Sequence, residues 1–416
     1  MIKIFEILKS DFNKNVLTLM SGTIVGQFFL FLITPILSRI YSQQIFGYYF
    51  LFIGIINILK KVVTLRYELV IVVSKNEKEV FNALIIAFFI NFSISILLFI
   101  LTVIANLFLV DFNIGISIFI IPLTIFFIGI FEIFIYLNNK NKNYKRITII
   151  RTLNNIINGT LQIIIIKISF LKLNGLIFGY SMAIIIVTIF LFFLNISYLK
   201  TNFKRYSFNT IKYLLIKHKK IPLYNTSINF VSNLSNELPV YLLAFLFGPL
   251  YAGVYGMANR IMGTPLDIVG QSIGNVFFQT AVDKYHTKKL NEFYVLSIKK
   301  IIRIGLIISF SILIITPFID VILGKEWNNS KLYIIILLPA FLVNFINQPL
   351  TSLPTILKKQ DIYLVYQIVF IVLKGISLFL GYILKNVYIS LIFYSITCIV
   401  YRIVILRWFK KEVKDL

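Results

Sequence analysis

The chain has few of the residues on which disulfide bonds, metal sites and most acid–base catalysis depend. Its single cysteine, Cys398, excludes an intramolecular disulfide framework. Its two histidines, His218 and His286, both fall in basic connections, which leaves no credible His/Cys metal cluster or Ser/His/Asp triad. The pattern G-x-x-x-x-G-K-[ST] of an ATP-binding phosphate loop is missing as well. The sequence therefore disfavours an enzyme and predicts no cofactor.

Acidic residues are also scarce: 16 Asp and Glu stand against 41 Lys and Arg, and the formal net charge is +25. Such an excess could indicate a nucleic-acid partner. The basic residues, however, recur in every second connection between apolar runs, which is the positive-inside pattern of a membrane protein. The sequence therefore predicts no nucleic-acid partner, an even number of spans, and both termini in the cytoplasm.

Apolar residues make up 59% of the chain, and its mean hydropathy is +0.90. One soluble core could not hide that much apolar surface, and about 20 apolar residues suffice to cross a bilayer. The sequence predicts an all-α integral membrane protein with about twelve spans: 16–40, 45–73, 80–110, 113–137, 147–170, 173–198, 222–247, 249–279, 294–320, 331–357, 361–384 and 386–408. The charged first fifteen residues lack the features of a cleavable signal and are expected to lie along the cytosolic surface.

The spans divide into two halves around a basic segment. Residues 199–221 carry seven basic residues near the middle of the chain and predict a cytoplasmic linker between an N-terminal lobe, 1–198, and a C-terminal lobe, 222–416. At an offset of 206 residues, IFGYYFLF lies over YAGVYGMA, which aligns Gly47 with Gly253. Two six-helix lobes related as parallel repeats, with the substrate path between them, are a common transporter plan.

The second span contains charges that a lipid-facing helix would not tolerate. In LKKVVTLRYELVIVV, each central Lys, Arg or Asp costs about 2.5–3.5 kcal/mol on insertion scales. On one continuous helix, Asn57, Lys60, Lys61, Thr64 and Glu68 would share a side. Arg66 would point elsewhere. One interpretation is that these residues line an aqueous cavity; the alternative is that they snorkel or pair near the cytosolic end of the helix, which suits Arg66 and Glu68 better.

Hydrophilic sides recur in four further helices. The first span has a weak polar side around Pro35, and the seventh has a dense one before Pro239. In the seventh, eighth and tenth spans, these sides include Asn225, Asn229, Asn233, Asn236, Glu237, Arg260, Asp267, Gln271, Asn344 and Gln348. Lys374 in the eleventh span either snorkels or contacts the same cavity. One shared water-filled cavity would satisfy all these sides.

Four segments resemble a known family. They are SGTIVGQ, TPILSRIYSQQIFGYY and LRYELVIV near the start, and a further patch from 233 to 265, NLSNELPVYLLAFLFGPLYAGVYGMANRIMGTP. They are similar to bacterial polysaccharide repeat-unit flippases, the O-antigen and capsule translocases of the multidrug/oligosaccharidyl-lipid/polysaccharide exporter superfamily. The resemblance implies two six-helix bundles in a V with a central cavity. It also implies alternating access in the bacterial cytoplasmic membrane and an undecaprenyl-pyrophosphate-linked oligosaccharide as cargo.

With that cargo, the polar residues take expected roles. A diphosphate or an acidic sugar needs cations, and we assign it Lys60, Lys61, Arg66, Arg260 and Lys374. The amide and hydroxyl groups are assigned to the sugars: Asn57, Thr64, Asn225, Asn229, Asn233, Asn236, Gln271, Asn344 and Gln348. Glu68, Glu237 and Asp267 either couple transport to an ion or, as we favour, neutralise neighbouring cations. Membrane lipid, a polysaccharide polymerase and a chain-length regulator are the partners implied.

Two other functions stay open at this point. A cation-coupled multidrug exporter could have the same fold, although lipophilic cations favour an acidic cavity and this one is at least balanced in charge. A non-transporting scaffold of a glycan-assembly complex would make the polar sides of the helices dispensable.

Overall fold

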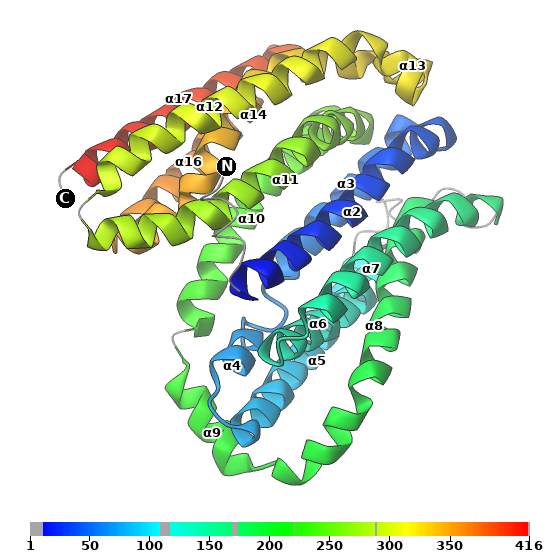
Figure 1. Cartoon of the computed structure of the whole chain (residues 1–416). Helices are drawn as coiled ribbons and strands as arrows, with labels where there is room; N and C mark the ends of the chain where they lie inside the picture. The colour runs from blue at the N-terminus through cyan, green and yellow to red at the C-terminus, as the bar shows by residue number, and fades with distance from the viewer. Residues whose placement is uncertain (1–10, 109–116, 169–173, 220, 288, 415–416) are drawn as a thin grey trace. The chain divides into compact units, whose positions relative to one another are not determined.

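The computed structural model describes residues 11–108, 117–168, 174–219, 221–287 and 289–414, and this part of the chain forms helices and turns without a strand. Twelve of the described helices have 17 residues or more (Figure 1). They are α2 (Asp11–Ile40), α3 (Gln43–Leu59), α5 (Glu77–Phe108), α6 (Ser117–Lys140), α7 (Tyr144–Ile164), α8 (Gly175–Asn202), α10 (Ser227–Phe247), α11 (Pro249–His286), α12 (Leu290–Ile315), α14 (Ser330–Asn347), α16 (Gln360–Ile383) and α17 (Val387–Lys414).

These helices confirm the predicted spans in number and order. Each predicted span overlaps one of the twelve, and residues 80–137 are divided between α5 and α6 as predicted. Eight segments within the described residues are long and apolar enough to cross a membrane, and two shorter apolar helices lie at Ile24–Ile40 and Gln43–Leu59. Of the first fifteen residues, predicted to lie along the cytosolic surface, 1–10 fall outside the described residues and the rest begin α2.

The tenth predicted span, 331–357, is wrong as one continuous helix. It consists of α14, a 3₁₀ segment η7 (Gln348–Ser352) and the short helix α15 (Leu353–Ile356). Pro349 and Pro354 lack the backbone N–H that would continue the α-helical ladder, so the chain tightens and then turns.

One compact unit comprises residues 1–33 and 52–234. In it α6 contacts α5 and α8, α7 packs along α8, and the short helix α4 (Glu68–Val73) lies against α5 and α6 (Figure 1). The predicted linker 199–221 contains the helix α9 (Phe208–Lys217), which packs on α5. Buried hydroxyl groups join α6 to α8, where Thr124 Oγ1 donates to Ser181 Oγ at 2.8 Å.

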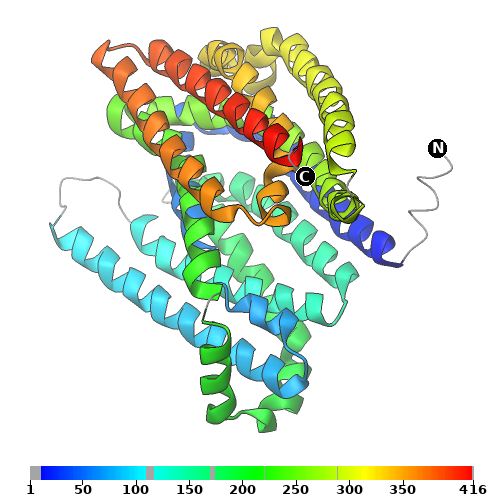
Figure 2. The same ribbon diagram turned by 90° about the vertical axis from the view of Figure 1, so that its left-hand side faces the viewer.

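A second compact unit comprises residues 34–51 and 235–416. Helix α14 contacts α11, α12 and α17, and α16 runs beside α17 (Figure 2). Leu266, Ile301, Phe345 and Ile346 form a buried cluster between α11, α12 and α14. The two units differ from the predicted lobes at the end of α2, at the start of α3 and in the first half of α10. The division into repeat-related lobes stays a prediction.

Within this second unit, the end of α2 and the start of α3 are fastened to C-terminal helices. Ser38 Oγ donates to the Leu323 carbonyl oxygen at 2.8 Å, and Trp327 Nε1 donates to the Ser38 carbonyl oxygen at 2.8 Å. Gly47 and Gly253, the two glycines aligned by the sequence repeat, lie against each other. A Cβ on Gly253 would lie only 2.9 Å from the Gly47 nitrogen and 2.0 Å from the Gln43 carbonyl oxygen, so this close approach requires glycine.

Candidate functional site

The second span breaks at its charged segment. Helix α3 ends at Leu59, residues 60–67 form hydrogen-bonded turns, and α4 begins at Glu68. Leu65 and Arg66 have φ angles of +46° and +62°, in the left-handed region that an α-helix never visits. The predicted continuous helix 45–73 is therefore wrong, and so is the shared helical side drawn through it, because its residues do not follow one 100° repeat.

The turn nevertheless brings the predicted polar residues of this span together. Lys60 Nζ donates to Asn57 Oδ1 at 2.6 Å. Lys61 Nζ lies 3.9 Å from Glu132 Oε1 of α6. Thr64 Oγ1 donates to Glu68 Oε2. We call Asn57, Lys60, Lys61, Thr64, Arg66, Glu68 and Glu132 the break cluster.

Arg66 was expected to point away from these residues, and this expectation is wrong. Its Nη1 lies 3.0 Å from Glu68 Oε1, and the two side chains are only 13% and 3% exposed. The left-handed backbone at Arg66 turns the side chain back toward the start of α4. The buried Nε of Arg66 has no hydrogen-bond partner among the described residues. Two of the three cations thus lie beside carboxylates, Lys61 near Glu132 and Arg66 against Glu68, while Lys60 donates to Asn57. The formal charges of the break cluster sum to one positive charge.

The polar side of the seventh span is divided between the two units. Asn225 lies in a π-helical turn, η4 (Ile221–Thr226), ahead of α10. Asn229 and Asn233 follow on α10 in the first unit, where Asn233 Nδ2 donates to the Asn229 carbonyl oxygen at 2.9 Å. Asn236 and Glu237 belong to the second unit and are exposed and half-buried, respectively.

In the second unit, the predicted residues of α11, η7 and α14 are called the α11–η7 set, within which the structure brings Asp267 and Gln348 together. Arg260 is half-buried beside Tyr49 of α3. Asp267, two turns along α11, lies within hydrogen-bonding reach of the Gln348 amide in η7. Gln271 is exposed one turn further on, and Asn344 is half-buried on α14. This set contains one cation, one carboxylate and three amides.

Lys374 lies in the interior of the second unit rather than on an open face. Its side chain is 3% exposed. Nζ donates to the Ser235 carbonyl oxygen at 2.7 Å and to Ser235 Oγ at 3.2 Å, and it lies 4.2 Å from the centre of the Phe370 ring. Ser235 offers a free carbonyl because Pro239, four residues later in α10, has no N–H to occupy it. Ser235 was not predicted as a partner, although Pro239 in the sequence signals its free carbonyl.

The predicted residues therefore form three groups: the break cluster in the first unit, the α11–η7 set in the second, and Lys374 with Ser235. Asn225, Asn229 and Asn233 belong to the first unit, and Asn236 and Glu237 to the second. A single chamber shared by all of them stays a prediction.

The fold is that of transporters of the MOP superfamily. A multidrug resistance transporter of the MATE family in an inward-facing conformation has 15% sequence identity to the chain and a TM-score of 0.71, with 94% of this chain and 95% of that chain covered. A MOP-superfamily transporter from Pyrococcus furiosus, whose binding pocket is described as reversed in polarity, has 15% identity and a TM-score of 0.63, with 98% and 97% covered. An outward-facing MATE transporter gives 14% identity and a TM-score of 0.61, with 99% and 98% covered.

Residues 36–332 match the family described as polysaccharide biosynthesis protein. This segment includes the break cluster, α10 and all of α11, and it covers more than half of the chain. The chain is thus a multi-pass membrane protein that belongs to this polysaccharide biosynthesis family. No curated protein matches it.

Proposed function

We propose that the chain is a flippase that moves an undecaprenyl-pyrophosphate-linked oligosaccharide across the bacterial cytoplasmic membrane by alternating access. The observation that carries this proposal is the break cluster, in which Lys60, Lys61 and Arg66 outnumber Glu68 and Glu132 within a membrane-spanning unit. Family membership supports a role in polysaccharide biosynthesis, and the fold supports transport.

The chemistry of the break cluster suits an anionic, hydroxyl-rich cargo. A pyrophosphate accepts hydrogen bonds from ammonium and guanidinium groups, and such charge-assisted bonds are about twice as strong as neutral ones. Among the described residues, the buried Nε of Arg66 has no hydrogen-bond partner, so it is a donor for a phosphate oxygen that reaches it. Asn57 and Thr64 add amide and hydroxyl groups of the kind that recognise sugars.

In the proposed flippase, the carboxylates of the break cluster neutralise its cations. Glu68 contacts Arg66 and Thr64, and Glu132 lies near Lys61, so each reduces the cost of placing a cation in a membrane protein. Asp267 and Glu237 lie outside the break cluster and are the remaining candidates for ion coupling. A polysaccharide polymerase and a chain-length regulator would be the protein partners of such a flippase.

Neutralising the lysines tests the proposal in cells whose surface polysaccharide depends on this chain. Because hydrogen bonds to charged groups contribute about 1.5–3 kcal/mol each, Lys60→Gln with Lys61→Gln should lower export at least tenfold. The matched control is Lys200→Gln on α8, an exposed lysine outside the break cluster, which should export normally. Membrane abundance of each variant is measured alongside export.

The same variants separate the two alternative functions. If the chain were a multidrug exporter of this fold, the lysine variants would lose drug resistance while glycan export persisted. If it were a scaffold for glycan assembly, export would survive neutralisation of the break cluster altogether. Either result would refute the flippase assignment.

A further inference from the structure

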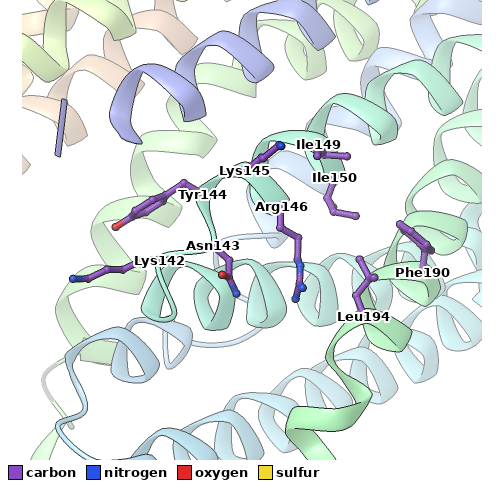
Figure 3. A pocket seen from close by; sticks show the side chains of 9 residues that line it. All are labelled: Lys142, Asn143, Tyr144, Lys145, Arg146, Ile149, Ile150, Phe190 and Leu194. Atoms are coloured by element: carbon purple, nitrogen blue, oxygen red, sulfur yellow. The ribbon is translucent and has the colours of Figure 1, made fainter. Parts of the chain in front are cut away.

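A pocket outside the three groups lies where α6 turns into α7. It has a volume of about 830 Å³ and is lined by Lys142, Lys145 and Arg146, with Ile149 on α7 and Phe190 and Leu194 on α8 (Figure 3). All six residues belong to the first unit. No carboxylate is among the residues that line it, within the part of the chain that the structure describes.

Two buried asparagines hold the guanidinium of Arg146 in place. Arg146 Nη1 donates to Asn138 Oδ1 at 3.2 Å, and Asn138 Nδ2 donates to Asn195 Oδ1 at 3.2 Å. Asn138 and Asn195 are 0% and 4% exposed. The N-terminus of α7, which begins at Tyr144, adds its partial positive charge at the same place. The pocket therefore has a positive end with one fixed cation and two exposed lysines.

The other end of the pocket is apolar and open. Ile149, Phe190 and Leu194 are 47%, 48% and 38% exposed, which in a membrane protein is surface available to lipid chains. The positive-inside rule accounts for basic residues in this connection, but it requires no asparagine pair behind Arg146 and no apolar wall beside it. The combination matches a molecule with an anionic head and a hydrocarbon body.

We propose that this pocket binds the headgroup of an acidic glycerophospholipid in the predicted cytoplasmic leaflet. The phosphate lies against Arg146 and the N-terminus of α7, and the first part of an acyl chain lies along Phe190 and Leu194. Lys142 and Lys145, whose side chains extend in different directions in Figure 3, add positive charge at the rim. Basic pockets between membrane helices on the cytoplasmic side are known to suit anionic lipid headgroups. The pocket is separate from the break cluster, so this site does not depend on the proposed cargo.

Native mass spectrometry of the purified full chain tests the site. Phosphatidylglycerol should be retained in preference to phosphatidylcholine. The variant Lys142→Gln with Lys145→Gln should weaken phosphatidylglycerol retention by about 25-fold, since a surface lysine contributes about fivefold to acidic-lipid binding. Lys200→Gln, at the end of α8 outside the pocket, should leave retention within about twofold of the wild type. Equal retention of the two lipids, or no loss in the double variant, would overturn the proposal.

Two further arms identify the source of the phosphate. Soluble glycerol 3-phosphate should compete poorly with phosphatidylglycerol. Efficient competition would indicate a soluble ligand and overturn the lipid assignment. Leu194→Gln, which makes the apolar wall polar, should weaken retention of phosphatidylglycerol. Undecaprenyl pyrophosphate should not displace phosphatidylglycerol at equal concentration; if it does, the pocket is a cargo site instead. The double variant leaves Arg146 and its asparagines intact, and an unchanged thermal midpoint checks that it is folded.

Discussion

Lys374 Nζ lies 2.7 Å from the carbonyl oxygen of Ser235, the one backbone acceptor that Pro239 releases in α10. The ammonium group also lies over the Phe370 ring, which stacks on Tyr401 at 3.8 Å between ring centres. A proline in one helix thus accommodates a buried lysine from another. Since Lys374 is 3% exposed, this contact is a packing feature of the second unit.

We expect Lys374→Met to be tolerated. Methionine keeps the volume of the side chain and removes a buried charge, which offsets the loss of the bond to Ser235. Lys374→Ala leaves a cavity instead and should cost about 2–4 kcal/mol. Thermal unfolding in detergent compares the two. Lys374→Met should also keep glycan export, and a loss of export at unchanged stability would restore the cargo role predicted from the sequence.

Because Gly47 and Gly253 lie in contact, a single methyl group added at Gly253 should lower the stability of the folded chain. Gly253→Ala places a Cβ 2.0 Å from the Gln43 carbonyl oxygen, so the backbones of α3 and α11 must separate. Overpacking of this kind costs about 1–3 kcal/mol. Gly375→Ala on α16 is the control, because its Cβ meets nothing within 4 Å and should be neutral or slightly stabilising. Similar thermal midpoints for the two variants would show that the close approach is not required.

The pair of Arg66 and Glu68 is suited to a double-mutant cycle. Arg66→Met and Glu68→Gln should each destabilise the chain, because each leaves a buried charge without its partner. The double variant should be more stable than the sum of the single effects predicts, by about 1–3 kcal/mol. Arg205 and Glu77 provide the comparison: they are 3.8 Å apart with side chains 46% and 48% exposed, and their coupling should be close to zero. Equal couplings in the two cycles would contradict the burial argument.

His218 lies between α9 and η4, outside the predicted spans, and we expect its titration to make the stability of the folded chain depend on pH. Partial burial, and then the charge of Lys217, lower the pKa of the imidazole below its usual 6.5. The folded chain therefore binds this proton less readily than the unfolded chain. As the pH falls through 6.5 and below, proton uptake favours the unfolded chain, so the free energy of unfolding decreases. In a His286→Gln background, an NMR titration should give a midpoint below 6.5, and Lys217→Gln should raise it. A midpoint at or above 6.5 would contradict this environment.

Hydropathy was enough to predict the twelve helices, because each span must satisfy its own backbone and present apolar side chains. The break in the second span was not predictable in the same way. Leu65 and Arg66 take left-handed backbone angles without a glycine, proline or asparagine to signal them. The continuous helical side predicted here is therefore wrong, and Arg66, expected to point elsewhere, pairs with Glu68.

Sites built from separate segments were harder still. The pocket beside Arg146 depends on Asn138 and Asn195, which are 57 residues apart and have no shared pattern in the sequence. The basic residues there had been explained by topology alone. Pro239 indicates a free carbonyl at Ser235 from the sequence alone, but only the packing of α16 against α10 identifies Lys374 as its donor.

If the break cluster binds the anionic part of a lipid-linked glycan during transport, its lysines set the rate of transport. This rate is measured as the initial rate at which the purified chain in proteoliposomes moves undecaprenyl-pyrophosphate-linked oligosaccharide between leaflets. We predict that Lys60→Gln with Lys61→Gln lowers this rate at least tenfold, whereas Lys200→Gln leaves it unchanged. Equal rates for wild type and the double variant would contradict it.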